Sequence, residues 1–340
     1  MSISPITIKD IAKILGISKS TVSRALKNHP DISQTTKDLV LQLADVLHYR
    51  PNTVAISLRN KKSKIIGLIV PQISYFFFPS VIKGIEDEVH KHDYRLMILH
   101  SNELYEREVE ACGMMLSSNV EGILASVSRK TKDFKHFQNI IDSDTPIVFF
   151  DRVPDSLLAD KVLVDDIDGA YNAIKHLIDI GRTKIAICIG NPNLLICKNR
   201  LAGYKNALKA HNVSVDENYI ISCQTPEEAE AETNRLLNMQ EPPDSIFAIS
   251  DLTMSGIMQA VYKNNLKIPE DIAVIGFCEE PFSLMYNPPL STIKPMGFEI
   301  GKTAAELLFK RIKSDEAENF EPKQIDLKTD MIIRASTVNR

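Results

Sequence analysis

The sequence lacks the short motifs that mark many enzyme active sites. It contains no Walker phosphate-binding loop, no GxGxxG fingerprint, and neither the HExxH nor the GxSxG motif. Nucleotide chemistry and hydrolysis are therefore without support, and we expect a protein that is not an enzyme and needs no cofactor. The five cysteines lack the paired spacing of a zinc site, which favours reduced structural thiols.

Two groups of residues that could bind a metal have simpler explanations. Asp165, Asp166 and Asp168 lie where a strand should end and a helix should begin, and carboxylates at that place favour the helix dipole. The histidines His90, His92 and His100 have no carboxylate or cysteine partner at a metal-ligand spacing and are expected at the surface. We therefore expect no bound metal.

Long hydrophobic runs are missing as well. No stretch of about 18 apolar residues occurs, and the N-terminus lacks the charged-then-apolar pattern of a secretory signal. We therefore expect a cytosolic protein. With 44% hydrophobic and 25% charged residues the composition is that of a globular protein, and 340 residues are too many for one ordinary core, so two or three domains are expected.

The net charge of −4 hides an asymmetry between the two parts of the chain. Residues 1–64 contain eleven Lys or Arg against four Asp or Glu, a net charge of +7, whereas the remainder holds 29 against 40, a net charge of −11. A small basic region on an acidic body suggests that the first part contacts a polyanion and the second does not.

Residues 7–26 have the pattern of two short helices joined by a tight turn. Thr7 and Asp10 form a capping-box pair, Gly16 can turn without steric cost, and Ser18 is a favourable N-cap for the second helix. Apolar residues follow the helical period on one face of each helix: Ile8, Ile11, Ala12 and Leu15, then Val22, Ala25 and Leu26. With a basic, hydroxyl-bearing outer face this pattern predicts a helix-turn-helix, although an αα-hairpin without DNA contacts fits these residues equally well.

A third helix is expected to complete this region. Ser33 is its expected N-cap, Leu39, Leu43 and Val46 have helical spacing, and the helix should end near Tyr49. The three helices should pack together as one small headpiece.

The next segment could form a helix of only two turns. Pro51 suits a first helical turn, and Val54, Ala55 and Leu58 share one face. So short a helix is marginal by itself. We expect it to form only with help from a partner chain or from DNA.

From residue 64 onward, short apolar runs alternate with helical patterns. Continuous apolar runs predict strands that are buried on both faces: residues 65–70, 95–99, 122–126, 147–150, 185–189, 245–249 and 272–277. Helical patterns fill residues 79–92, 104–118, 133–142, 168–180, 199–211, 226–238, 252–264 and 297–313. Strands alternating with helices predict an α/β body of doubly wound parallel sheets. The strands are too many for one compact unit, so we expect two lobes, with the chain crossing between them at 151–161 and 291–295.

Taken together, the ordered motifs resemble the lac repressor (LacI/GalR) family of bacterial transcription regulators over essentially the whole chain. The motifs that carry the resemblance are IKDIA at 8–12, GIS at 16–18, STVSRAL at 20–26, RPN at 50–52, GLIVP at 67–71, FFDR at 149–152, RLAGY at 200–204, IGF at 275–277 and PLSTI at 289–293.

The resemblance implies three domains. Residues 1–49 would be a helix-turn-helix DNA-binding headpiece, and residues 50–63 a hinge helix and linker. Residues 64–340 would be an effector-binding and dimerisation domain similar to periplasmic sugar-binding proteins. Within this body, the expected boundaries are: lobe one at about 64–150 plus 295–320, and lobe two at about 160–290 plus 321–340.

The family also implies a homodimer whose headpieces bind two half-sites of a near-palindromic double-stranded DNA operator. Lys19, Ser20 and Arg24 match the positions where the family's recognition helix reaches base edges, and arginine pairs well with guanine. Leu58 matches the residue that the family's hinge helix inserts into the minor groove, unless it only packs in a dimer contact. The other expected DNA contacts are Thr7, Thr21, Ser23, Lys27, Asn52 and Ala55. Thr21, Ser23 and Lys27 look like phosphate contacts, with helix capping or solvent exposure as the alternative for the first two.

In the body, the resemblance implies a ligand cleft at the carboxyl ends of the strands. Phe77 and Phe78 match the family's aromatic contacts, although at least one of the consecutive phenylalanines should belong to the core. Asp151 matches a ligand carboxylate, and Arg200 a ligand arginine whose fork suits hydroxyl pairs or a carboxylate. The other expected effector contacts are Ser126, Asn191, Ser250, Asp251 and Cys278.

Two departures from the family pattern concern the effector. Sugar-binding members often have Asn-Asp and Asp-Asp where this chain has Ser250-Asp251 and Cys278-Glu279. Lobe two thus loses an amide and a carboxylate that would face the ligand. The effector could be an unusual sugar or a sugar derivative, and a purine or nucleoside corepressor or a phosphoprotein partner stays an alternative.

We therefore predict a ligand-responsive repressor of carbohydrate-utilisation genes. A transport-type binding protein of the same fold would need a signal peptide and would have no basic headpiece. No leucine heptads follow Arg334, so a dimer is expected rather than a tetramer.

Overall fold

The computed structural model describes residues 6–50, 63–314 and 321–338. The chain forms two compact units, Met1–Ser63 and Lys64–Arg340, here called the headpiece and the body. Within the described residues, no helix has the length and apolar character needed to cross a membrane. The helix expected between Pro51 and Leu58 lies outside the described residues.

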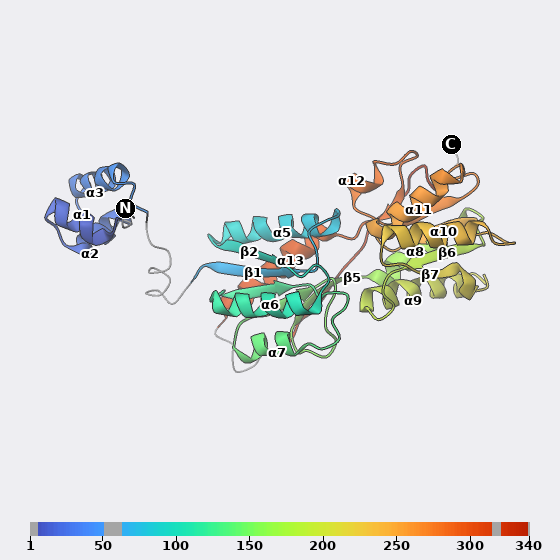
Figure 1. Ribbon diagram of the computed structural model, residues 1–340, viewed down its shortest axis with the longest axis horizontal. Helices are drawn as coiled ribbons and strands as arrows, with labels where there is room; N and C mark the ends of the chain where they lie inside the picture. Colours follow the sequence, from blue (N-terminus) through green and yellow to red (C-terminus); the bar gives the residue numbers. More distant parts are fainter. Residues whose placement is uncertain (1–5, 51–62, 315–320, 339–340) are drawn as a thin grey trace. The chain divides into compact units, whose positions relative to one another are not determined.

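The described part of the headpiece contains three helices, α1 (Ile8–Leu15), α2 (Lys19–Leu26) and α3 (Gln34–Val46) (Figure 1). The capping residues and the turn glycine have the roles expected from the sequence. The backbone N–H of Thr7 donates to the Asp10 carboxylate over 2.8 Å, Gly16 has a φ of 65°, and the Ser18 hydroxyl accepts the backbone N–H of Thr21 over 3.0 Å. The helix-turn-helix pattern is confirmed.

The buried face of α3 differs from the expected one. Val40 and Ala44 pack into the headpiece core, whereas Leu39 and Val46 are 52% and 69% exposed. The sequence between 39 and 47 is apolar on more than one face of the helix, so its periodicity could not select the buried one.

The body contains two six-stranded sheets, as predicted for a doubly wound α/β fold. The first sheet has the order β11 (Gln324–Leu327), β5 (Asp160–Val164), β4 (Ile147–Phe150), β3 (Gly122–Ala125), β1 (Ile65–Val70) and β2 (Arg95–His100), all parallel. The second has the order β12 (Met331–Ile332), β10 (Ser291–Ile293), β9 (Ala273–Phe277), β8 (Ser245–Ala248), β6 (Ile185–Ile189) and β7 (Ile220–Ser222), in which only β12 is antiparallel.

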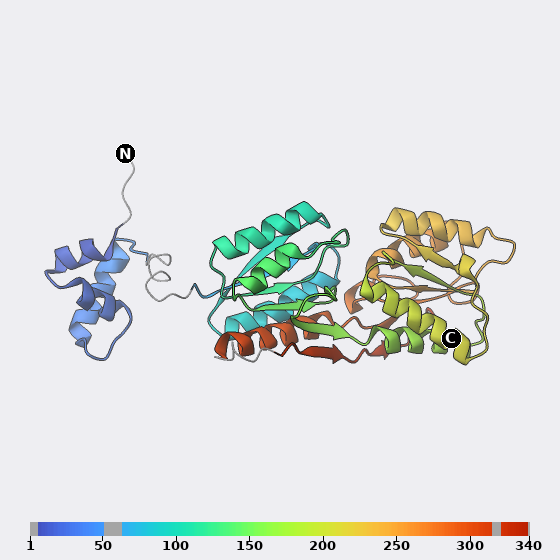
Figure 2. The same ribbon diagram turned by 90° about the horizontal axis from the view of Figure 1, so that it is seen from below.

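Helices cover both faces of each sheet (Figure 2). In lobe one, α5 (Phe77–Lys91) and α13 (Gly297–Lys313) pack on one face, and α6 (Tyr105–Ser117) and α7 (Lys135–Asp142) on the other. In lobe two, α8 (Asp166–Asp179) and α9 (Leu195–Ala210) oppose α10 (Pro226–Leu237) and α11 (Asp251–Lys263). Two short helices, η1 (Glu217–Tyr219) and α12 (Glu280–Ser283), complete lobe two.

Helices α5 and α13 approach each other closely through two glycines. A Cβ atom on Gly84 would lie 2.1 Å from the carbonyl oxygen of Phe298, and one on Gly301 would lie 2.1 Å from that of Val81. Neither position can accept a larger residue unless the backbone moves.

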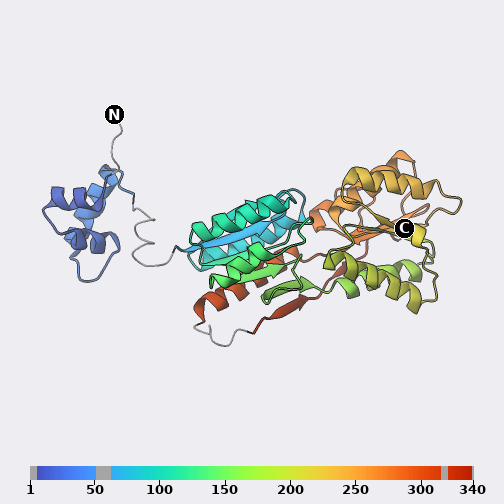
Figure 3. The same cartoon turned by 60° about the horizontal axis from the view of Figure 1, so that its bottom comes forward.

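The chain crosses between the lobes at three places: between β5 and α8, between β10 and α13, and between β11 and β12 (Figure 3). The expected crossing at 151–161 is wrong, because β5 and β11 both belong to the sheet of lobe one. The buried carboxylate of Asp160 explains why: it accepts two hydrogen bonds from Arg311 of α13 and one from the backbone of Lys323. Lobe one therefore includes residues 160–164 and 324–327, which the expected boundaries gave to lobe two.

Candidate functional site

The outer face of α2 is basic and polar. Lys19, Ser20, Arg24 and Lys27 are exposed there, and the α2 helix contains no acidic residue. The Arg24 guanidinium lies 4.0 Å from Asp31, an exposed pair that leaves the arginine free to turn to another anion. This face combines positive charge with hydroxyl groups on one side of a short helix, which suits a polyanion.

Other expected DNA contacts take part in the local structure of the headpiece. The hydroxyl of Thr7 contacts the Asp10 carboxylate over 2.7 Å, and that of Thr21 contacts the Ser18 hydroxyl over 2.8 Å. Ser23 is half-buried. The contacts of Thr7 and Thr21 stabilise the starts of α1 and α2 in the free protein. A hydroxyl oxygen has a second lone pair, so such a contact does not prevent a further hydrogen bond to DNA. The remaining expected contacts, Asn52, Ala55 and Leu58, lie outside the described residues.

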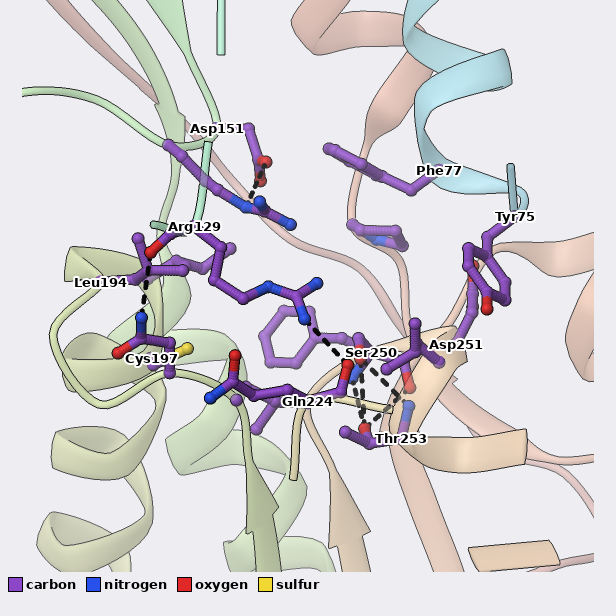
Figure 4. Close-up of a pocket in the computed structure, with 18 of the residues that line it drawn as sticks. Tyr75, Phe77, Arg129, Asp151, Leu194, Cys197, Gln224, Ser250, Asp251 and Thr253 are labelled. Atoms are coloured by element: carbon purple, nitrogen blue, oxygen red, sulfur yellow. Dashed lines mark hydrogen bonds and ion pairs between the residues drawn. The ribbon is translucent and has the colours of Figure 1, made fainter. Parts of the chain in front are cut away.

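The body has a cleft between its lobes, with a free volume of about 130 Å³. Its walls are formed largely by residues that follow the carboxyl ends of strands in both sheets, where open α/β sheets bind ligands. Seven of the nine expected effector residues line it: Phe77, Phe78, Asp151, Asn191, Arg200, Ser250 and Asp251. Figure 4 labels four of them, Phe77, Asp151, Ser250 and Asp251.

The other two expected residues lie behind the walls of the cleft. Ser126 is fully buried, and its hydroxyl is 3.5 Å from the Asp151 carboxylate. Cys278 is also fully buried and interacts with Asp251. Both can therefore act on a ligand only through the carboxylates in front of them.

Three consecutive phenylalanines occupy three different environments. Phe76 packs on the core of lobe two, with its ring 5.6 Å from that of Phe282. Phe77 borders the cleft, and Phe78 is 3% exposed in the core of lobe one. The rings of Phe77 and Phe78 meet edge to face at 5.2 Å. The expectation that at least one of them belongs to the core is confirmed.

Arg200 is held by several groups of its own lobe. Its Nε donates to Asp166 over 2.7 Å, its Nη1 donates to the carbonyl of Ile249, and its guanidinium lies 3.6 Å from the centre of the Phe277 ring. Burial, opposed by the charge of Arg200, raises the pKa of Asp166 to about 6. The arginine is thus fixed in orientation where it borders the cleft.

A second charged cluster, on lobe one, was missed from the sequence. Glu103 accepts hydrogen bonds from Arg129 at 3.2 Å and from Arg152 at 2.9 and 3.0 Å. Arg152 also lies 3.8 Å from Asp151, whose pKa is raised by burial against the opposing charge of that arginine. Asp151 itself has a φ of 58°, in the left-handed region, so the backbone turns sharply at the end of β4. The polar wall of lobe one is therefore an array of alternating charges.

Further lining residues also escaped the sequence reasoning. Gln72 and Gln224 each come two residues after a strand, so the rule of strand ends could have found them. The same rule covers further lining residues that end a strand or follow one within two positions: Arg152, Gly190, Cys223, Ile249, Phe277 and Pro295. The others lie on loops or near helix starts with no distinguishing pattern: Ser74, Tyr75, Arg129, Leu194, Ile196, Cys197, Leu252 and Thr253. Leu194 and Cys197 form an apolar wall opposite the rings of Tyr75 and Phe77 (Figure 4).

Two acidic side chains of lobe two lie close together beside the cleft. The backbone N–H of Glu279 donates to the Asp251 carboxylate over 3.1 Å. Burial raises the pKa of each to about 7, and the charge of Asp251 contributes to the shift of Glu279. Near neutral pH this corner of the cleft therefore holds about one negative charge fewer than its sequence suggests.

The arrangement suits the binding of a polar ligand that has one apolar face. Rings and aliphatic groups border the cleft, and carboxylates, guanidinium groups and amides point into it. Among the described residues, no group of three or more His, Cys, Asp or Glu could hold a metal ion.

Comparison with known proteins agrees with both halves of this description. The family described as "Bacterial regulatory proteins, lacI family" matches residues 7–52, and the "Periplasmic binding protein-like domain" matches residues 174–337. The HTH-type transcriptional repressor PurR of Vibrio campbellii is 32% identical over 332 residues, which cover 96% of this chain and 97% of that protein. The chain belongs to the LacI family. It is a ligand-responsive, DNA-binding transcriptional regulator.

Solved structures of transcription regulators share its fold. The transcription regulator CcpA of Lactococcus lactis matches with a TM-score of 0.73 and 26% identity over 81% of this chain and 99% of that one. The lac repressor dimer, bound to operator and an anti-inducer, matches with a TM-score of 0.86 over 99% of this chain and 100% of that one, at 22% identity. The predicted architecture, a helix-turn-helix headpiece followed by a two-lobed body, is confirmed.

Proposed function

We propose that this LacI-family regulator is a cytoplasmic homodimer that represses carbohydrate-utilisation genes and responds to a sugar or sugar derivative in its cleft. The observation that carries the sugar proposal is the composition of the cleft. Aromatic surface from Tyr75 and Phe77 faces a set of carboxylate, guanidinium and amide groups. Such a pairing satisfies both the C–H face and the hydroxyl groups of a sugar. We propose no catalytic activity.

For DNA, we propose that Lys19, Ser20 and Arg24 contact base edges and that Lys27 contacts phosphate. Exposure of these side chains on one face of α2 supports the assignment. Arginine and lysine can bind guanine through two acceptors, which specifies sequence, whereas a phosphate contact only positions the protein. Leu58 would open the central minor groove between the two half-sites.

A dimer is supported by apolar side chains that remain exposed on lobe one. Ile98 lies on β2 at the edge of its sheet, and Val109 and Met114 lie on α6. All three are at least 38% exposed. A second copy of the chain would cover these side chains. Sedimentation of the full-length protein measures whether it is a dimer in solution.

A purine or nucleoside corepressor is the second candidate for the effector. A flat base could stack against Tyr75 or Phe77, while the amides of Gln72 and Gln224 bind its edge. The two candidates differ in a measurable way, because a sugar depends on Asp151 and Asn191 for its hydroxyl groups and a base depends on ring stacking.

The test begins by selecting DNA from a random pool with the full-length protein. A near-palindromic consensus supports the proposal, and recovery of unrelated sequences contradicts it. Sugars, sugar derivatives, purines and nucleosides are then added one by one to the protein–operator complex, and their binding is measured by calorimetry. Millimolar or tighter binding by a sugar supports the carbohydrate proposal. Binding by purines alone replaces it with the second candidate, and binding by neither class contradicts a small-molecule site of either type.

A further inference from the structure

Arg129 of lobe one contacts lobe two at the mouth of the cleft through two separate groups. Its Nη1 donates to the backbone carbonyl of Gln224 over 2.8 Å. Its own carbonyl oxygen accepts a hydrogen bond from the Asn191 side chain over 3.0 Å. Figure 4 shows the Arg129 side chain extending toward Gln224. One residue thus joins the two lobes at two points.

The same residue is fixed to its own lobe by a single carboxylate. Glu103 accepts the Arg129 backbone N–H over 2.7 Å and its Nη2 over 3.2 Å. Arg152 binds the other side of Glu103, and the three side chains are only 13–16% exposed. Burial by itself would raise the pKa of Glu103, but the charges of Arg152 and Arg129 hold it below its ordinary value, so the carboxylate stays ionised at neutral pH.

The backbone at Asn102 and Glu103 has an energetically unfavourable conformation. Asn102 and Glu103 have φ values of 51° and 62°, both in the left-handed region that residues with a side chain rarely adopt. Such conformations persist where surrounding contacts determine them. Here the hydrogen bonds from two arginines to Glu103 provide those contacts.

We propose that Arg129 is a latch that holds the two lobes together before any effector binds, and that Glu103 is its positioning residue. This rests on the proposed function only in using the same cleft. Arg129 borders that cleft. An effector therefore enters a body whose lobes are already joined, and a ligand group that draws the guanidinium away from the Gln224 carbonyl would loosen the closed form. The closed form is then the more populated one even without a ligand, and a ligand raises or lowers its population.

The test measures the distance across the mouth of the cleft in the full-length protein without ligand or DNA. Lys132→Cys and Glu227→Cys place one spin label on each lobe near the latch, at exposed positions. All five native cysteines are buried, but Cys197 and Cys223 border the cleft, so both are replaced by alanine throughout the series to keep the labels on the new thiols. Dilution with unlabelled protein restricts the pulsed EPR signal to pairs within one chain.

In the otherwise unchanged protein, a short distance should dominate. Arg129→Gln and Asn191→Ala each remove one hydrogen bond between the lobes, so each should raise the ratio of open to closed molecules by about 2- to 10-fold. The double variant should raise it further. Arg129→Lys should behave like Arg129→Gln, because lysine keeps the charge but lacks the planar fork that reaches Glu103 and Gln224 together.

Two further variants separate the latch from general effects of charge. Arg152→Gln also removes a guanidinium group from Glu103, but Arg152 has no hydrogen bond to lobe two among the described residues, so this variant should open the cleft less than Arg129→Gln does. Glu103→Gln should open the cleft while far-UV circular dichroism shows an unchanged fold.

The latch is overturned if the parent protein is mostly open, or if Arg129→Gln and the double variant leave the distances unchanged. It is also overturned if Arg152→Gln opens the cleft as much as Arg129→Gln does. Because no ligand or operator is present, none of these outcomes depends on the sugar proposal. Failure of the sugar panel would leave the latch standing.

Discussion

Glu279 should make the stability of the body depend on pH. Its Oε1 atom is buried and has no hydrogen-bond partner among the described residues, and the nearby backbone N–H of Gly297, at the start of α13, only partly favours the ionised form. Burial and the neighbouring Asp251 raise the pKa of Glu279 from 4.5 to about 7. Above neutral pH, the folded protein therefore contains an ionised carboxylate with one uncompensated oxygen.

The sign of the effect follows from proton linkage. The folded state holds the Glu279 proton more tightly than the unfolded state, so stability falls as the pH rises from about 4.5 to about 7. At about 1.4 kcal/mol per pKa unit, the shift corresponds to roughly 3 kcal/mol above pH 7. Glu279→Gln is neutral at every pH. With some relief from nearby water, we expect it to be more stable than the parent by about 1–3 kcal/mol at pH 8, and by less than about 1 kcal/mol at pH 5.

Urea unfolding of the full-length protein at pH 5 and pH 8, followed by circular dichroism, measures this difference. Glu280→Gln is the matched control, because the neighbouring Glu280 is exposed and pairs with Arg334 at 3.0 Å and with Lys294 at 3.5 Å. It should not stabilise the protein at either pH. Equal effects of Glu279→Gln at both pH values, or a loss of stability at pH 8, would refute the reasoning.

Three further expectations concern helix packing and DNA. Gly84→Ala should destabilise the body by about 3 kcal/mol because its Cβ meets a backbone carbonyl, whereas Gly113→Ala, with nothing within 4 Å, should stabilise α6 by about 0.5–1 kcal/mol. Equal urea midpoints for the two variants would contradict this. Arg24→Ala should weaken operator binding by about 5- to 150-fold and relax one base preference. Lys27→Ala should weaken binding to all sequences and lower the salt slope by about 1, and a slope that stays constant argues against a phosphate contact. Leu58→Ala should weaken operator binding at least about tenfold without changing thermal unfolding, and unchanged affinity would exclude the wedge.

The sequence predicts the elements of the core well, because their signals are local. The strands at 65–70, 147–150 and 185–189 are found as expected, since continuous apolar runs are buried on both faces of a parallel sheet. The capping residues Thr7 and Ser18 likewise act within three positions of themselves. Signals of this kind need no knowledge of distant residues.

Features that depend on distant partners could not be predicted. Strand β5 begins with a buried aspartate, which looks unfavourable until Arg311, 151 residues away, binds it. Arg129 stands in a polar loop without periodicity, and its contacts with Glu103 and Gln224 appear only when both lobes are folded. Seven of the expected cleft residues do border the cleft, because the position of a family match or of a strand end could be read from the sequence, whereas Arg129 and Glu103 had neither signal.

The three phenylalanines that precede and open α5 make the loop before them sensitive to its length. Because Phe76, Phe77 and Phe78 serve lobe two, the cleft and lobe one in turn, their roles depend on position and not on chemistry. Removing one residue between Val70 and Phe76 would keep every ring but shift each into its neighbour's environment. Evolution can therefore exchange side chains in this loop more freely than it can insert or delete them, and homologous regulators should differ here in composition before they differ in length.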